Sequence, residues 1–256
     1  MIHIENIHLY RNEKIILDNL NWHVAKNEHW AILGLNGCGK TTLLKVVNGY
    51  IWPNDGKVQV LGETYGQTYI PTLRRRIGWV SNAMLDHFNW RDSAIEIVLS
   101  GKFGALRLFE EVSEEEIANA VEIMKHFHCE HLANKEFEYL SQGERQRVQI
   151  ARAIMAEPEI LILDEPCGGL DILERENLLE TIKQIATKEN CPTLIYVTHH
   201  VEEILPCFTH VLLMKDGKDV AADVREAILT EECLSNFFGQ PIRLQHERNR
   251  AWVALK

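Results

Sequence analysis

GLNGCGKTT, residues Gly34–Thr42, is the stretch that decides the fold of this chain. It follows the apolar run Trp30–Leu33 and precedes the apolar residues 43–47, so a strand is expected to turn directly into a helix. The spacing G-x-x-x-x-G-K-T is that of a phosphate-binding loop. Glycines let backbone N–H groups curl around phosphate oxygens, and the N-terminus of the following helix adds partial positive charge. The stretch therefore predicts a triphosphate site.

The whole loop is a candidate nucleotide-binding segment, comprising Gly34, Leu35, Asn36, Gly37, Cys38, Gly39, Lys40, Thr41 and Thr42. Lys40 can reach the β- and γ-phosphates and is a candidate catalytic residue, and the Thr41 hydroxyl can ligate Mg²⁺. Cys38 is interpreted as a small space-filling residue rather than a nucleophile, although a helix N-terminus could lower its pKa. Taken alone, the loop leaves open a glycine-rich turn that caps an ordinary helix.

Composition favours a globular protein with no field that attracts nucleic acid. The 256 residues are 46% hydrophobic and 25% charged, and the formal net charge is −10. A chain this acidic must hold an anion by local geometry, so no nucleic-acid partner is expected. MIHIENIHLY at the start lacks the pattern of an export signal, and no apolar run approaches the ~20 residues of a membrane span. With six cysteines and no C-x-x-C pair, a cytoplasmic protein is expected, peripheral to a membrane only through a partner.

The first half of the chain changes from β-type to helical patterns. Residues 1–33 contain several short β-type stretches, with Tyr10 between two of them, and residues 77–82 form another strand that runs into a loop. A helical segment follows at residues 83–140. Within it a capping box, Ser113 to Glu116, opens a helix whose expected apolar face is Ile117, Val121, Met124 and Phe127.

In the second half, strands and helices alternate. A second capping box, Ser141 to Glu144, opens a helix that runs to Pro158. The apolar run 160–163 ends in Asp164, and a second strand, 193–197, ends just before His199. Alternating strands and helices predict an α/β sheet whose ligands sit at the carboxyl ends of the strands.

Three groups are candidates for chemistry at those strand ends. Asp164 directly follows a buried strand, where a carboxylate holds Mg²⁺ through water, and Glu165 is placed to polarise an attacking water. His199 can contact a γ-phosphate, while its neighbour His200 is expected to point elsewhere. A cluster at residues 126–131 contains three histidines and Cys129, but it lacks a second half, so a histidine-rich helix end is preferred to a metal site.

Five motifs in order carry a family resemblance, namely GLNGCGKTT (34–42), YLSQGERQR (139–147), LILDEP (161–166), GGLD (168–171) and VTHH (197–200). With them the chain resembles the nucleotide-binding domain of ABC ATPases over roughly residues 1 to 220. The signature Leu140–Glu144 distinguishes this family from other phosphate-loop NTPases. The resemblance implies a P-loop α/β fold of the ABC type, a mixed sheet with an antiparallel part plus an inserted α-helical subdomain.

The resemblance also implies ATP and Mg²⁺ as ligands and a head-to-tail dimer with a second copy of the chain. Each signature helix would point its N-terminus at ATP held by the other copy, through Ser141, Gln142, Gly143 and Glu144. The other implied roles are adenine stacking by Tyr10, Mg²⁺ positioning by Asp164, general base catalysis by Glu165, a switch role for His199 and communication across the dimer by Asp171.

Three positions depart from the family pattern. Gln142 replaces a small residue and Glu144 a glutamine, and both changes look tolerable because the capping Ser141 and Gly143 remain. Asn82 stands where the family has a glutamine that links Mg²⁺ and the attacking water to a membrane partner. Asparagine is one methylene shorter, so its reach falls by roughly 1.5 Å, and an indirect metal contact is expected.

The expected division is an ATP-binding core at residues 1–82 and 141–220, a helical subdomain at 83–140 and a small C-terminal extension at 221–256. The leading hypothesis is an ATPase that energises transport through separate membrane-spanning subunits. The stretch Ile95–Gly101 resembles importer subunits for metal chelates. Two alternatives stay open at this point: a soluble ABC ATPase without a membrane partner, and a nucleotide-gated interaction module that does not hydrolyse ATP.

Overall fold

The computed structural model describes the backbone of residues 1–256 and every side chain except those of Ala83 and Asp86. The chain folds into two compact units. The first contains Met1–Leu73 and Thr193–Lys256, and the second contains Arg74–Pro192. Each unit has its own buried apolar side chains.

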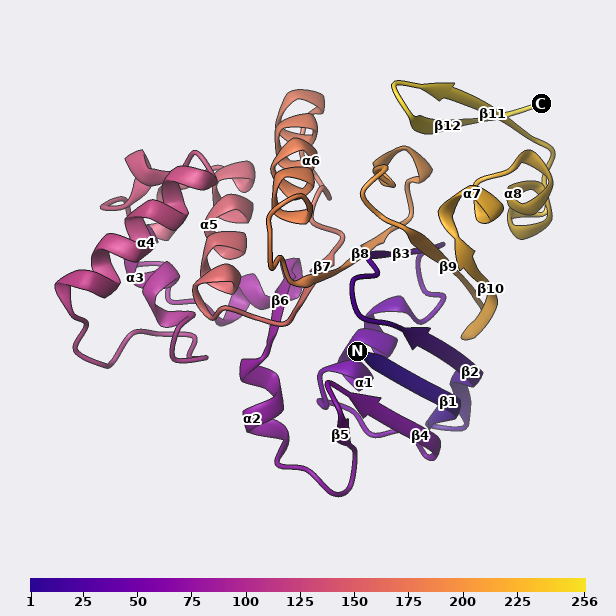
Figure 1. Ribbon diagram of the computed structural model, residues 1–256, viewed down its shortest axis with the longest axis horizontal. Helices are drawn as coiled ribbons and strands as arrows, with labels where there is room; N and C mark the ends of the chain where they lie inside the picture. The colour runs from indigo at the N-terminus through magenta and orange to yellow at the C-terminus, as the bar shows by residue number, and fades with distance from the viewer. The chain divides into compact units, whose positions relative to one another are not determined.

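An antiparallel sheet with the strand order β2-β1-β4-β5 lies in the first unit (Figure 1). Its strands are β1 (Ile2–Arg11), β2 (Lys14–Val24), β4 (Asp55–Val60) and β5 (Glu63–Thr64). Buried residues alternate with half-buried ones along much of β1, as expected for a strand with one face on a core. Tyr10 lies within β1, opposite Ile15, so the expectation that it lies between two strands is wrong. The reason is that β1 and β2 continue to a tight turn at residues 12–13.

This unit also contains β3 (Trp30–Gly34), β8 (Thr193–Thr198), β9 (His210–Lys215) and β10 (Lys218–Val224). β3 pairs in parallel with β8 and with β9, and β10 runs antiparallel to β9. β3 and β8 are buried along their whole length, which explains their unbroken apolar sequences. Helix α1 (Lys40–Val47) follows β3 after the predicted loop and ends before Gly49, whose φ is +67°.

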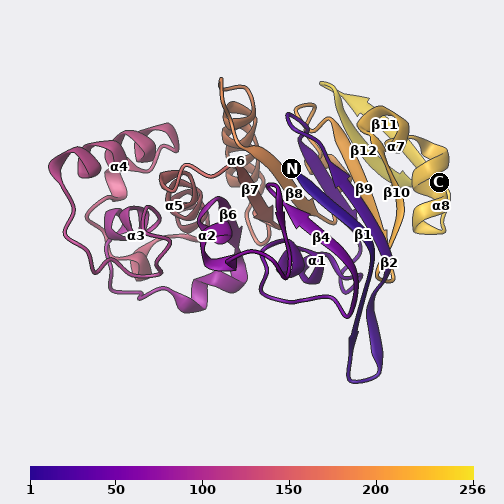
Figure 2. The same ribbon diagram turned by 60° about the horizontal axis from the view of Figure 1, so that its bottom comes forward.

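The C-terminal residues add two helices and a hairpin to the first unit. These elements are α7 (Arg225–Ile228), α8 (Glu231–Phe238), β11 (Ile242–Glu247) and β12 (Arg250–Leu255). Both views show them gathered beside β9 and β10 (Figures 1 and 2). The small C-terminal extension expected at residues 221–256 stays a prediction as a separate part of the chain.

The second unit combines a pair of parallel strands with helices. Its strands are β6 (Ile77–Ser81) and β7 (Ile160–Asp164). Its α-helices are α3 (Ala94–Ser100), α4 (Glu114–His126), α5 (Gln142–Met155) and α6 (Ile172–Ala186). The unit also contains the last two residues of α2, which spans Ile70–Arg75. A 3₁₀ helix, Asn82–His87, follows β6. The division into core, insertion and extension given by the sequence stays a prediction.

Helix α3 approaches α5 closely. A Cβ on Gly101 would overlap the carbonyl oxygen of Arg152, so glycine is required at the end of α3. The guanidinium of Arg152 lies 5.2 Å from the Phe88 ring centre, and its Nε donates to Ser100 Oγ at 3.2 Å. These contacts anchor α3 on α5.

The expected apolar face of α4 is partly wrong. Ala120 and Met124 are fully buried, whereas Ile117 is 38% exposed. α4 packs against both α3 and α5, and the side toward these two helices is centred on Ala120 and Met124. The buried face of α4 therefore lies further toward Ala120 than the apolar pattern of the sequence predicts.

Candidate nucleotide-binding site

The predicted phosphate loop has the backbone of an anion cradle. Gly37 and Gly39 have φ values of +81° and +106°, which are conformations that favour glycine. Lys40 is only 5% exposed, and its Nζ donates to the carbonyl oxygens of Gly34 at 2.7 Å and Leu35 at 3.3 Å. As at any helix start, the first backbone N–H groups of α1 have no acceptor within the helix. The loop thus presents amides, a helix N-terminus and an ammonium group to one small region.

Cys38 fills space beneath this loop. A Cβ on Gly34 would lie 2.5 Å from Cys38 Sγ and 2.7 Å from the carbonyl oxygen of Met214, so the sulfur packs directly on the glycine. Burial raises the pKa of the Cys38 thiol and outweighs the nearby Lys40 charge. The space-filling interpretation agrees with this raised pKa, and the lowering of the pKa that a helix N-terminus could cause is not the dominant effect.

Strand register places His199 at the same sheet edge as the phosphate loop. Leu33 on β3 pairs with Thr198 on β8, so these two parallel strands end at the same edge of the sheet. The sequence suggests that His200 points away from the site of His199, and this expectation is wrong. Its ring centre lies 4.2 Å from that of His199, with 39° between the ring planes. Consecutive residues after a strand normally diverge, but here the backbone turns into the 3₁₀ helix Val201–Glu203.

Tyr10 presents an accessible ring. It is 45% exposed, its ring lies parallel to that of His8 at 6.2 Å, and its backbone N–H donates to Asn54 Oδ1 at 2.8 Å. An exposed ring with a fixed backbone is suited to stacking on a base. Its contact with adenine stays a prediction.

The acidic pair follows β7 in the second unit. Asp164 is 7% exposed and pairs in register with Ser81, the last residue of β6. Glu165 has a φ of 49°, a left-handed conformation that costs a side-chain-bearing residue about 1–3 kcal/mol. Such strain persists where the surrounding structure fixes the backbone, and it is frequent at functional positions.

A buried amide network fixes that turn, and the sequence did not reveal it. Gln146 on α5 is 1% exposed. Its Nε2 donates to the carbonyl oxygen of Pro166 at 2.9 Å and to Asn82 Oδ1 at 3.2 Å, while its Oε1 accepts from Gln149 at 3.2 Å. Gln146 therefore joins Asn82 to the turn that carries Glu165. The metal contact predicted for Asn82 stays a prediction.

The signature residues form the N-terminus of α5. Ser141 Oγ accepts from the Glu144 backbone N–H at 3.3 Å, and Glu144 Oε2 accepts from the Ser141 N–H at 2.7 Å, which confirms the predicted capping box. Burial alone would raise the pKa of Glu144, but the hydrogen bonds from Ser141 outweigh it and lower that pKa. A Cβ on Gly143 would overlap Glu174 Oε2, so a larger residue here would require the Glu174 side chain to move.

Gln142 and Asp171 join the signature to the GGLD turn. Gln142 Nε2 donates to the Gly168 carbonyl oxygen at 2.6 Å. This bond accounts for a long polar side chain where the family pattern has a small residue. A Cβ on Gly169 would lie 2.6 Å from the same nitrogen, and Gly169 has a φ of +76°. Asp171 caps α6 by accepting from the N–H groups of Leu173 and Glu174 at 2.9 and 3.0 Å. The role of Asp171 across a dimer stays a prediction.

The histidine-rich segment 126–131 does not assemble a metal site in the part of the chain with described side chains, where no three His, Cys, Asp or Glu residues converge as ligands. Burial raises the pKa of the Cys129 thiol to about 12, which disfavours the thiolate that binds metals. Among the described helices, none is long and apolar enough to cross a membrane.

The residues present fit Mg-ATP. The Gly34–Thr42 loop supplies the amides and ammonium that a triphosphate needs. Mg²⁺ prefers hydroxyl, carboxylate and water oxygens, and the sequence assigns Thr41 and Asp164 as its donors. Ser81, which pairs with Asp164, is 3% exposed, and its hydroxyl has no hydrogen-bond partner among the described residues. This oxygen at the strand end is therefore available to a metal ion or its water.

A phosphate loop after a buried parallel strand, with an acidic pair after another such strand, defines a phosphate-loop nucleotide hydrolase of the α/β class. Comparison with known proteins makes this assignment specific. The ABC transporter family model matches residues 17–168. The uncharacterized ABC transporter ATP-binding protein YlmA of Bacillus subtilis is 44% identical over 254 residues, 99% of this chain and 96% of that protein.

Two further matches agree. The molybdate import ATP-binding protein MolC of Haemophilus influenzae is 30% identical over 240 residues, which is 93% of this chain and 88% of MolC. The dimeric post-hydrolysis structure of the ATP-binding cassette MJ0796 bound to ADP and Pi superposes with a TM-score of 0.77 at 26% identity, covering 88% of this chain and 98% of the cassette. The chain therefore belongs to the ABC transporter family and is an ABC-type ATPase, which confirms the predicted family and fold class.

Proposed function

We propose that this chain is a cytoplasmic ATPase subunit that binds and hydrolyses Mg-ATP as a head-to-tail dimer of two copies and energises transport through separate membrane-spanning subunits. The observation that carries the proposal is the phosphate loop, where buried Lys40 closes onto the carbonyl oxygens of Gly34 and Leu35 at the start of α1. The capped N-terminus of α5 supports the dimer, because such a terminus favours a phosphate of the other copy.

In this mechanism the loop amides and Lys40 bind the β- and γ-phosphates, and Tyr10 stacks on adenine. Thr41 and Asp164 hold Mg²⁺, directly or through water, and the ion neutralises charge on the phosphates when bound. Glu165 orients a water and takes its proton as the water oxygen attacks the γ-phosphorus. The bond from that phosphorus to the β–γ bridging oxygen breaks, and ADP leaves. His199 donates a hydrogen bond to the γ-phosphate.

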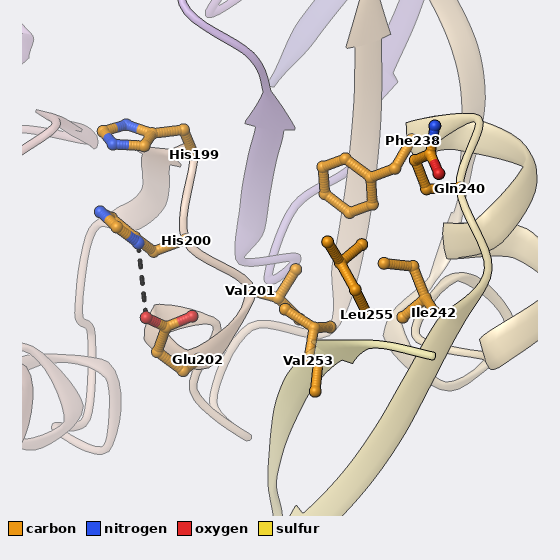
Figure 3. A pocket seen from close by; sticks show the side chains of 10 residues that line it. His199, His200, Val201, Glu202, Phe238, Gln240, Ile242, Val253 and Leu255 are labelled. Carbon is orange, nitrogen blue, oxygen red and sulfur yellow. Dashed lines mark ion pairs between the residues drawn. The ribbon is translucent and has the colours of Figure 1, made fainter.

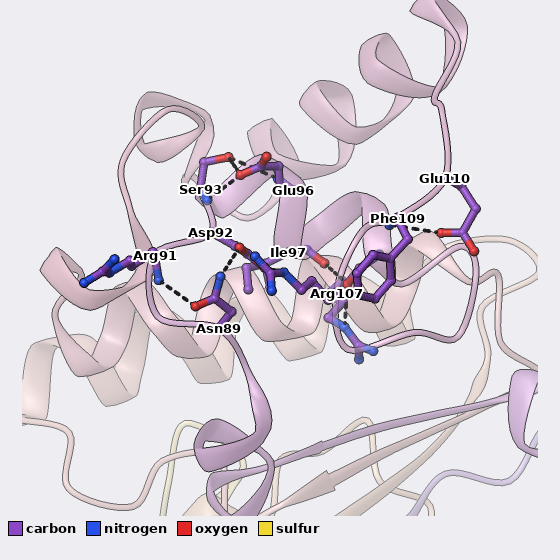
Figure 4. Close-up of polar contacts among 11 residues, drawn as sticks. Asn89, Arg91, Asp92, Ser93, Glu96, Ile97, Arg107, Phe109 and Glu110 are labelled. Atoms are coloured by element: carbon purple, nitrogen blue, oxygen red, sulfur yellow. Dashed lines mark hydrogen bonds and ion pairs between the residues drawn. The ribbon is translucent and has the colours of Figure 1, made fainter.

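Import is the direction of transport that we propose. MolC is named as a molybdate import protein, and the stretch Ile95–Gly101 resembles importer subunits. In the second unit Leu106 is 39% exposed. Phe109 is 79% exposed and lies beside Arg107, which pairs with Asp92 (Figure 4). Exposed apolar side chains with a polar rim are typical of an interaction surface. We assign this surface to the membrane-spanning partner.

The variant Glu165→Gln tests the enzyme. Removing the proton acceptor is expected to lower kcat by about 10²- to 10⁴-fold while ATP still drives dimerisation. Turnover is measured by phosphate release and dimerisation by size-exclusion chromatography with and without ATP. Turnover equal to that of the wild type would remove Glu165 from the mechanism.

The same variant tests the partner. An ATP-trapped Glu165→Gln dimer is used as bait in detergent-solubilised membranes of the source cells, with Lys40→Ala as the control that cannot hold the phosphates. Recovery of an integral membrane protein with the first bait and not with the second supports a transporter. Recovery of soluble proteins alone would support a soluble ABC ATPase instead.

A further inference from the structure

The C-terminal hairpin borders a pocket that also contains the candidate switch histidine. The pocket has a volume of about 460 Å³. His199, His200 and Glu202 lie along one side of it, and Phe238, Ile242 and Leu255 lie along the other (Figure 3). The extension at residues 221–256 therefore reaches the segment that follows β8, where the ATPase mechanism needs a fixed side chain.

Arg250 makes the direct connection. It is the first residue of β12, and its Nε and Nη2 donate to the carbonyl oxygen of Glu202 at 2.9 and 2.6 Å. The guanidinium also lies 5.3 Å from the ring centre of Trp252, two residues along the same strand. Two hydrogen bonds from a planar group to one oxygen restrict the position of that peptide more than one bond would.

Glu202 passes this restraint to the histidines. Its Oε1 lies 3.4 Å from His200 Nδ1, an ion pair when the imidazole is protonated. The His200 ring contacts the His199 ring, with the centres 4.2 Å apart. A continuous set of contacts thus leads from Arg250 through Glu202 and His200 to His199.

The residue after Glu202 is fixed to the sheet. Glu203 is 3% exposed, and its Oε2 accepts from Tyr196 at 2.9 Å and from Thr198 at 2.6 Å. With Glu203 tied to β8 and Glu202 tied to β12, the four residues from His199 to Glu202 are held from two sides. Loss of the β12 side leaves the histidines on a segment restrained at the sheet alone.

We propose that Arg250 is a positioning residue for His199, so that the C-terminal hairpin is part of the hydrolytic machinery rather than an inert appendage. The inference rests on the proposed function, because it requires that His199 contacts the γ-phosphate. Arg250 itself touches neither nucleotide nor water in this mechanism. It acts by fixing the backbone of Glu202, and the effect reaches the reacting phosphate through His199.

The test compares Arg250→Ala with Arg250→Lys in the full-length chain, at a temperature where circular dichroism shows every variant to be folded. Arg250→Ala is expected to lower kcat about tenfold with KM for ATP within about twofold, since misplacing a group near the reacting centre affects the rate more than ground-state binding. Arg250→Lys keeps a donor and is expected to recover most of kcat. The matched control is Arg243→Ala, an exposed arginine on β11 of the same hairpin, which should retain the wild-type kcat.

A double-mutant cycle with His199→Ala separates this inference from the function on which it rests. If Arg250 acts through His199, adding Arg250→Ala to His199→Ala causes no further loss of kcat. A full additional tenfold loss, or an equal loss in Arg243→Ala, would overturn the inference while the proposed mechanism stands. Wild-type kcat in His199→Ala alone would instead remove His199 from the proposed mechanism.

Discussion

At the scale of single residues, Gln146 shows how a motif residue with no role assigned from the sequence can hold the turn that carries Glu165. Its amide supplies two donors and one acceptor, and all three are used, by Pro166, Asn82 and Gln149. The Pro166 carbonyl directly follows Glu165, whose φ of 49° must be held by its neighbours. Gln146 is the neighbour with the geometry to hold it.

We expect Gln146→Met to lower the free energy of unfolding by about 1–3 kcal/mol, because the buried carbonyl of Pro166 loses a donor. Its kcat should also fall, because the Glu165 turn is released. Gln149→Met is the matched control, since Gln149 is a buried glutamine of the same helix that bonds to Gln146 and not to the turn. Urea unfolding and steady-state kinetics measure the two effects, and equal losses of kcat in both variants would contradict the role of Gln146.

Sequence could identify the residues of the loop and the acidic pair because each motif is local. Gly34 to Thr42 form one continuous turn, and Asp164 is defined by the strand before it. Gln146 and Asn82 are 64 positions apart, and their contact depends on how α5 packs on the turn after β7. The tilted contact between the His200 and His199 rings depends in the same way on the backbone after β8, which no residue pattern specifies.

At the scale of elements, capping boxes were the most reliable sequence signal. Those of α4 and α5 were predicted, and the structure adds one at α3, where Ser93 and Glu96 bond reciprocally (Figure 4). The Ser-x-x-Glu spacing at α3 could have revealed it. The buried face of α4 could not be placed as well, because its contacts come from two helices at once and rotate the stripe toward Ala120 and Met124.

The capping box of α4 gives that helix a pH-dependent stability. Hydrogen bonds from Lys102, then from the backbone and side chain of Ser113, lower the pKa of Glu116 to about 2 from its ordinary 4.5. A carboxyl with a depressed pKa stabilises the folded chain fully above the unfolded pKa, and this stabilisation is lost as pH falls from about 4.5 to about 2. We expect Glu116→Gln to lower Tm at pH 7, and the difference from the wild type to shrink through that range.

Thermal melts at pH 7, 4.5 and 3 measure this difference, and added salt should reduce it because the ion pair is partly exposed. Glu114→Gln is the control, since it lies in the same first turn at an exposed position. A Tm difference between Glu116→Gln and the wild type that stays constant from pH 7 to pH 3 would show that the carboxylate charge does not stabilise the helix.

At the scale of the whole molecule, the proposed function requires two copies of the chain to complete one site. The phosphate loop and the signature each have a partly prepared surface: amides and ammonium at α1, and a capped, exposed helix start at α5. In the proposed head-to-tail dimer, each of these surfaces would be used twice. The extension 221–256 was the least predictable part, because the docking of β12 on the segment after β8 depends on tertiary contacts such as Arg250 to Glu202.

The variant Ser141→Arg separates ATP binding from dimerisation. A large cation at the start of α5 removes the cap and blocks the surface that faces ATP of the second copy. The phosphate loop is unchanged, so ATP binding by one chain should persist, whereas ATP-driven dimerisation and turnover should be lost. Ser113→Arg is the matched control: it removes the capping serine of α4, at a similar cost of about 1 kcal/mol, but in a different helix.

Binding of a fluorescent ATP analogue, size-exclusion chromatography and the dependence of turnover on protein concentration distinguish the outcomes. Wild-type chain and Ser113→Arg should show turnover per chain that rises with protein concentration, because two copies must meet before either site is complete. Ser141→Arg should bind the analogue and stay monomeric at every concentration. If Ser141→Arg hydrolysed ATP at the wild-type rate per chain, the signature would not contribute to the site, and a single chain would be the complete enzyme.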